Sequence, residues 1–228
     1  MPKAFEKKPS QLNNQVTFML NITEQNISEE PSKKTLILFG NPRGGTTMIA
    51  NVVRSMGIFL GDDLPVNLED SGFNWDVLTK QNPNWGRNQK LSTIQQLIEK
   101  RNTDHDIWGW KYPRSDRFLE EISSNLINPM LICVFRDIVA TTWRNVVRRG
   151  QPPINLMQNA LNLQASNLNL IEKSGIPSLL ISYEKAISDP FQLTSSLNQF
   201  MNLNLTEDQL KLSSTMVNPE LGYNASKI

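Results

Sequence analysis

The sequence has very few of the residues that most often bind metals or form cross-links. Its 228 residues include one cysteine and one histidine, so the chain cannot form an internal disulfide or a cysteine-based zinc site. Cys133 lies in an apolar run, which is typical of a free cysteine in a protein core. His105 lies in a polar turn between two aspartates, where we expect a surface position. We therefore expect no metal site and look to other side chains for chemistry.

Strong net charge and long apolar runs are also missing. Lys and Arg total 23 and Asp and Glu total 22, a net charge of +1, which argues against a nucleic-acid partner or a polybasic membrane surface. No apolar run reaches the ~18 residues of a membrane span, and no apolar segment of a secretion signal follows the N-terminal lysines. We expect a cytoplasmic protein whose anion sites come from local clusters of charge.

A phosphate-binding pattern lies between residues 34 and 47. An apolar run over 35–39 leads into a turn with three glycines, and a helical pattern begins at Thr46. A buried strand, a glycine loop and a helix N-terminus together present backbone N–H groups to an anion. The sequence therefore predicts an anion site in this turn.

The same turn departs from a nucleotide P-loop at one position. Gly40 and Gly45 have the P-loop spacing and Thr47 stands at the Ser/Thr position, but Thr46 replaces the lysine. That lysine reaches the transferred phosphate in ATPases, so its absence argues against an ordinary ATPase. Arg43 is the cation within the loop, and its planar guanidinium suits the oxygens of phosphate or sulfate.

Alternating strand and helix patterns predict one α/β domain with a central parallel β-sheet flanked by helices in three layers. We assign residues 1–34 to a partly ordered N-terminal arm, in which 16–22 form an edge strand or a short helix, and 35–228 to the domain. Val139, Trp143, Val146 and Val147 fall on one face of a helix after Asp137. Strands are predicted at 35–39, 107–111, 130–135 and 178–182, and the other helices at 46–56, 91–101, near 118–122 and at 154–173.

Polar segments follow each of these strands. They are residues 40–47, 111–114, 136–137 and 183–184. Because ligands of parallel α/β sheets bind beyond the carboxyl ends of the strands, we expect these segments to share one site.

Two of these segments resemble motifs of the sulfotransferases. Residues 41–47 (Asn-Pro-Arg-Gly-Gly-Thr-Thr) resemble the family's 5′-phosphosulfate loop, with Gly44 where the family has serine. Residues 134–137 (Val-Phe-Arg-Asp) are similar to its 3′-phosphate motif, an apolar strand that ends in arginine, with Ile138 where proline is usual.

Three further segments resemble the same family. Residues 108–114 resemble a Gly-Trp-Lys-Asp-Pro-Arg stretch of bacterial and capsular-polysaccharide-type members, with Tyr112 in place of aspartate. Residues 57–70 are similar to a segment of those members in which an acidic pair faces the acceptor, and 182–190 to the family's Tyr-Glu-Asp-Leu…Asp-Pro segment. The motifs follow the family's order over roughly residues 35–190.

The resemblance implies a P-loop-like fold and transfer of the sulfuryl group of 3′-phosphoadenosine 5′-phosphosulfate (PAPS) to a hydroxyl, or less readily an amine, of a saccharide or small-molecule acceptor. No metal is needed, because arginine and lysine supply the positive charge. It implies the following roles: Arg43, Gly44, Gly45, Thr46 and Thr47 at the 5′-phosphosulfate, Arg136 at the 3′-phosphate, Tyr183 at the adenine, Lys111 at the leaving phosphate, and Glu69 or Asp70 as general base.

Several points stay open at this level. Arg144 stands where the family has a phosphate-binding serine, but Thr141 or Thr142 are alternatives. Arg148 and Arg149 are expected to be solvated charges at a helix end, and residues 217–221 to close over the nucleotide. A P-loop kinase acting on a small molecule and a nucleotide-binding module that has lost catalysis are the alternative functions. The acceptor and the oligomeric state are not predicted.

Overall fold

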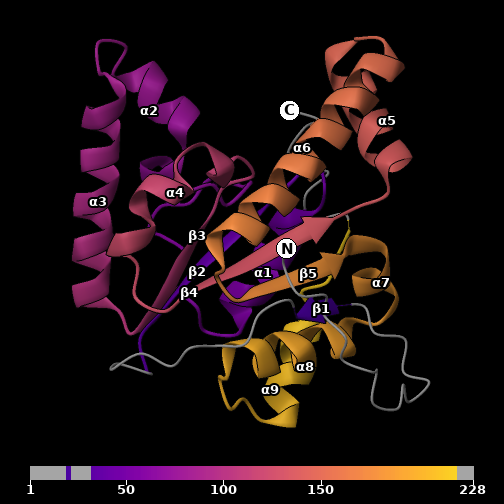
Figure 1. Ribbon diagram of the computed structural model, residues 1–228. Coiled ribbons are helices and arrows are strands. Elements are labelled where there is room, and N and C mark those ends of the chain that lie inside the picture. Colours follow the sequence, from indigo (N-terminus) through magenta and orange to yellow (C-terminus); the bar gives the residue numbers. More distant parts are fainter. Residues whose placement is uncertain (1–18, 22–31, 220–228) are drawn as a thin grey trace, which may run out of the picture.

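The computed structural model describes residues 19–21 and 32–219 (Figure 1). Its centre is a five-stranded sheet in the order β1-β5-β4-β2-β3. The pairs β2–β3, β2–β4 and β4–β5 are parallel, and β1 pairs with β5 in the antiparallel direction. The strands are β1 (Met19–Asn21), β2 (Lys34–Gly40), β3 (Ile107–Lys111), β4 (Pro129–Phe135) and β5 (Ser178–Ser182).

Helices fill most of the connections between these strands, and several begin and end at residues with known capping preferences. Asp189 accepts a hydrogen bond from the Gln192 amide at the start of α8, and α6 begins at a proline and ends at Gly175 in the left-handed conformation. The helices are α1 (Thr46–Ser55), α2 (Trp75–Gln81), α3 (Arg87–Asp104), α4 (Leu119–Ile122), α5 (Ile138–Arg149), α6 (Pro153–Ser174), α7 (Tyr183–Ser188), α8 (Pro190–Met201) and α9 (Glu207–Ser214).

The sheet separates two apolar cores. Successive residues of β2 point to opposite faces: Leu36 and Leu38 pack in one core with α1, α8 and α9, whereas Ile37 and Phe39 pack in the other with α3, α4 and α6. Figure 1 shows α1 and α6 on opposite sides of the sheet. This three-layer α/β arrangement confirms the predicted fold class, and the four predicted strands are all present.

Two elements were left open or not predicted by the sequence. Residues 19–21, which we assigned to the N-terminal arm, form the edge strand β1, so the strand alternative holds there; the rest of the arm before residue 32 lies outside the described residues. The short helix α2 (Trp75–Gln81) was not among the predicted helices. Asn74 caps it by accepting hydrogen bonds from the amides of Asp76 and Val77, and asparagine is a preferred N-cap residue.

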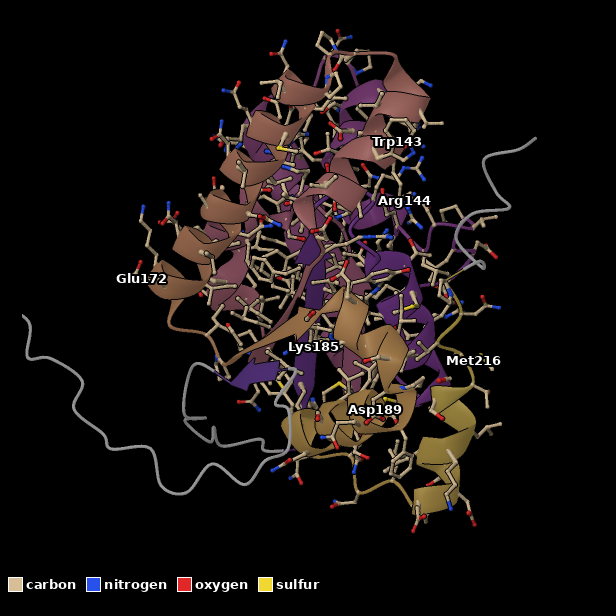
Figure 2. All side chains as sticks on the ribbon, turned by 90° about the vertical axis from the view of Figure 1, so that its right-hand side faces the viewer. Trp143, Arg144, Glu172, Lys185, Asp189 and Met216 are labelled. Carbon is tan, nitrogen blue, oxygen red and sulfur yellow. The ribbon has the colours of Figure 1, made fainter. Side chains whose placement is uncertain are left out.

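The apolar face of α5 is exposed. Val139, Trp143 and Val147 are 60%, 65% and 70% accessible, although their spacing is that of a packed helix. The side of α5 that carries Thr141 and Thr142 is the buried one, and α5 packs against α6. Figure 2 shows Trp143 and Arg144 on this helix, at the end of the molecule opposite Asp189.

The order of the parallel strands determines where a ligand site can form. From β2 the chain continues to β3 on one side and later to β4 on the other side. The connections therefore diverge at the carboxyl end of β2, which is the switch point where α/β sheets bind ligands. Within the described residues, no helix combines the length and the apolarity needed to cross a bilayer.

Candidate active site

The glycine loop lies at this switch point, between β2 and α1. A Cβ at Gly40 (φ 146°) would lie 2.5 Å from the carbonyl oxygen of Val134, so the chain can leave β2 beside β4 only without a side chain. Gly45 is the N-cap residue of α1, and no side chain caps the first amides of this helix. Such N–H groups at a helix N-terminus are suited to an anion.

The ring of Tyr183 packs against this loop at Gly45. The residue is 3% exposed, and the guanidinium of Arg136 lies over its ring, with Cζ 4.2 Å from the ring centroid. Gly45 packs so closely on the ring that a Cβ would lie 2.0 Å from Cδ2 of Tyr183. In this structure Tyr183 therefore holds both the loop and Arg136. Its contact with an adenine base stays a prediction.

Replacing Gly45 with alanine is expected to destabilise the fold and to abolish anion binding at the loop, because the new Cβ meets the Tyr183 ring and φ is +95°. Gly57→Ala is the matched control: φ is +91° there, but nothing lies within 4 Å of the position that the new Cβ would take. Backbone strain of about 1 kcal/mol is common to both. Thermal unfolding should show a clearly larger loss for Gly45→Ala, and equal losses would contradict the tight contact.

Lys111, at the end of β3, reaches the loop from the side. Its Nζ donates to Oε1 of Glu69 and to the carbonyl oxygen of Asn67, each at 2.9 Å, and to Oγ1 of Thr47 at 3.4 Å. Asn74 Nδ2 donates to Oε2 of Glu69 at 3.0 Å. The structure thus brings together Lys111, Glu69 and Thr47, which are far apart in the sequence.

Burial is the main cause that lowers the pKa of Lys111; the charge of Arg43 also lowers it, while Glu69 raises it. The side chain of Lys111 is 2% exposed and that of Glu69 is 18% exposed. A buried ammonium with a carboxylate on one side and a guanidinium nearby is a strong local charge. It is poised to interact with an anion held by the loop.

Arg43 occupies a strained position. Its φ is 69°, in the left-handed region that costs residues with a Cβ about 1 kcal/mol or more. Its carbonyl oxygen accepts a hydrogen bond from Nη1 of Arg136 at 3.5 Å, and the residue lines the cavity above the loop. If only the backbone conformation mattered, glycine or asparagine would be favoured at this position. An arginine here indicates that its side chain is needed, and strained residues of this kind concentrate at functional sites.

Arg136 is not among the lining residues of the cavity, but it contacts Tyr183 and Arg43, which are. Its Nε is 3.9 Å from Oε1 of Glu184, and this buried nitrogen forms no hydrogen bond with any residue that the structure describes. Burial, followed by repulsion from Arg144, lowers the pKa of Arg136. Two neighbouring guanidinium groups repel each other, and a bound anion would relieve this repulsion.

Arg144, and not Thr141 or Thr142, lines the cavity from α5. Both threonines face the buried side of the helix, and their hydroxyl oxygens have no hydrogen-bond partner among the described residues. Arg148, one helical turn after Arg144, also lines the cavity. Its side chain is exposed, as we expected of a charge near a helix end, and its spacing of four from Arg144 places both residues on one face of α5.

Asp70, our alternative to Glu69 as general base, is not available for that role. Its carboxylate forms a buried ion pair with Arg101 of α3 and caps the short turn at 71–73.

His105 also lies away from the cavity, and its ring stacks on that of Phe59 with 3.9 Å between the ring centroids. Arg114 is paired with Asp116.

The glycine loop, the end of β3, one side of α5 and the tail surround one cavity of about 230 Å³. Gly45, Thr46 and Thr47 form part of its wall, together with Asn67 and Pro113, to which we had assigned no role, and with Asn218 and Pro219 of the predicted closing segment. The tail therefore reaches the cavity at residues 218–219, and residues 220–221 of the predicted closing segment lie outside the described residues. Among the lining side chains, four are cationic and one, Glu69, is a carboxylate; the cations are Arg43, Lys111, Arg144 and Arg148.

Tyr112, which departs from the aspartate of the resembling motif, has a packing role. Its hydroxyl donates to Oδ2 of Asp76 at 3.1 Å and its ring is buried.

In the part of the chain that the structure describes, no group of three or more His, Cys, Asp or Glu side chains is arranged to hold a metal ion.

Comparison with known proteins supports the architecture. No family model matches the sequence, and no curated protein matches it. Among solved structures, the sulfotransferase domain of the olefin synthase from Synechococcus PCC 7002 is similar, with a TM-score of 0.54 and 16% sequence identity over 91% of this chain and 92% of that domain. The chain thus has the P-loop-like α/β fold of this sulfotransferase domain.

Proposed function

We propose that the protein is a sulfotransferase that moves the sulfuryl group of PAPS to a hydroxyl, or less readily an amine, of a saccharide or small-molecule acceptor. The observation that carries this proposal is the junction of Lys111, Glu69 and Thr47 beside the glycine loop, in a cavity whose other charged lining residues are arginines. A donor with anionic groups on both the 5′ and the 3′ oxygen of its ribose needs positive charge at more than one place in the cavity.

The residues present fit this donor. The uncapped amides of α1, together with Gly44, Gly45, Thr46, Thr47 and Arg43, would hold the 5′-phosphosulfate. Arg136 and Arg144, whose mutual repulsion would be relieved by an anion, would hold the 3′-phosphate. Tyr183 would border the adenine, although the Arg136 guanidinium already covers one face of its ring.

The chemistry requires one bond to break and one to form. The bond between sulfur and the bridging oxygen breaks, the acceptor oxygen bonds to sulfur, and the acceptor proton must leave. Lys111 would neutralise the charge that develops on the leaving phosphate, and Glu69 would take the proton. The 2.9 Å contact between them allows both roles in one place.

Calorimetry with 3′-phosphoadenosine 5′-phosphate (PAP) tests the donor assignment. We expect micromolar binding to PAP and at least about tenfold weaker binding to 5′-AMP, because loss of a charge-assisted contact costs ~1.5 kcal/mol or more. ATP with Mg²⁺ is the second control. A preference for ATP with Mg²⁺ would favour the kinase alternative, and tight PAP binding without transfer to any acceptor would favour the inactive module.

A further inference from the structure

The loop that carries Glu69 contains a strained residue. Leu68 has a φ of 55°, in the left-handed region, and its side chain is 5% exposed within the core beside α1. A leucine adopts this conformation only where its surroundings hold it. The contacts on either side of Leu68 therefore decide how this loop presents its polar groups.

On one side, the loop is fixed by a buried charge pair. Arg101 of α3 donates to Oδ2 of Asp70, and both side chains are at least nine-tenths buried. Oδ1 of Asp70 also accepts from the Gly72 amide at 2.8 Å. The Arg101 guanidinium lies 5.2 to 5.5 Å from the centroids of three aromatic rings, those of Phe59, Phe73 and Trp108.

On the other side, the loop meets Lys111. The carbonyl oxygen of Asn67 and Oε1 of Glu69 both accept from Nζ of Lys111 at 2.9 Å. These acceptors stand immediately before and after Leu68, so the left-handed turn directs both of them to the same atom. Any relaxation of this turn would separate Glu69 from Lys111.

We propose that Arg101 and Asp70 are positioning residues, which act from outside the cavity to hold the Leu68 turn and thereby keep Glu69 and the Asn67 carbonyl aimed at Lys111. The catalytic meaning of this inference rests on the proposed function. Its geometric part, that the buried pair controls the contact between Lys111 and Glu69, does not. The competing view is that the pair only stabilises the fold.

The double variant Asp70→Asn with Arg101→Met separates these views. A single replacement would leave an unpaired buried charge and destabilise the fold, whereas removal of both charges of a buried pair is often neutral. The asparagine keeps the acceptor oxygen for the Gly72 amide. Arg87→Met with Glu121→Gln is the matched control, since that pair also joins α3 to another element but does not touch the loop.

The first readout is the titration of Lys111, followed by NMR with isotope-labelled lysine. Glu69 raises the pKa of Lys111, against the lowering by burial and by Arg43. With Arg43, Arg144 and Arg148 unchanged around the cavity, loss of the Glu69 contact should lower this pKa in the double variant and not in the control. This readout needs no donor or acceptor, so it stands even if PAP does not bind.

The second readout is the rate of PAP formation from PAPS. We expect kcat to fall by about 10- to 100-fold in the double variant, since small displacements at a reacting group have effects of this size, with the Kd for PAP within about twofold of that of the unchanged protein. Arg101→Lys keeps the charge and should show smaller changes in both readouts, and it serves if the double variant does not fold. An unchanged Lys111 titration and kcat in a folded variant would overturn the proposal.

Discussion

Replacement of Arg43 with alanine is expected to lower the rate of sulfuryl transfer by about 10³-fold while leaving the protein folded. Arg43 lines the cavity beside the uncapped N-terminus of α1, where its guanidinium would face the oxygens of the transferred group. Removal of one donor from a site where charge develops in the transition state costs about 10²- to 10³-fold. Steady-state PAP formation measures the loss.

Arg43→Gly makes this test sharper. Because Arg43 has a φ of 69°, glycine would relieve strain that alanine retains, and we expect the glycine variant to be about 1 kcal/mol more stable than the alanine variant. Both should be inactive. Arg54→Ala, an exposed arginine near the end of α1, is the control and should keep full activity. Transfer that persists in Arg43→Gly would refute the assigned role.

Replacement of Lys111 with methionine is expected to lower kcat by about 10²-fold or more, since the leaving phosphate loses its neutralising charge. Methionine keeps much of the buried apolar volume, so the fold should remain. Lys90→Met is a matched control, because Lys90 is also buried, but near Trp75 and outside the cavity. Normal thermal unfolding with a lost rate in Lys111→Met alone would support the role.

The pH dependence of Lys111 gives an independent check. Burial lowers its pKa from the ordinary 10.5, so the unfolded chain holds this proton at pH values where the folded protein has released it. The free energy of unfolding should therefore rise as the pH increases from the folded pKa toward 10.5, and Lys111→Met should remove this contribution. The rate of transfer should fall over the same range, because the charged form is the useful one.

Measurement of kcat between pH 7 and 10 checks this expectation. In the unchanged protein the alkaline limb should begin below the ordinary pKa of lysine, and in Lys111→Met the residual rate should not show it. An alkaline limb that persists in Lys111→Met would assign it to another group. Donor binding should change less than kcat, because the loop and the arginines remain.

The sequence located the strands and their polar ends well, for a physical reason. A fully buried parallel strand such as β2 or β4 needs a nearly continuous apolar run, and the loop after it needs glycine where the backbone is left-handed or crowded, as at Gly40 and Gly45. These requirements are local. They are visible in the order of residues without knowledge of the neighbours.

The sequence could not resolve which of several similar side chains faces the cavity. Thr141, Thr142, Arg144 and Arg148 share one helix, and their roles depend on the rotation of α5 against α6. The apolar spacing of Val139, Trp143 and Val147 suggests that their side of α5 packs inward, but these side chains are exposed. Apolar spacing alone therefore gives the wrong orientation for this helix. Asp70 and Glu69 are adjacent, yet one is paired with Arg101 and the other with Lys111.

The sequence by itself therefore determined the α/β class, the position of the glycine loop and the set of charged residues at the strand ends. The tertiary structure decided which of these residues meet. Lys111 and Glu69 come together because β3 lies beside β2 and because Leu68 is held in a left-handed turn. Strand order and a strained loop are products of long-range packing, and no local pattern of residues encodes them.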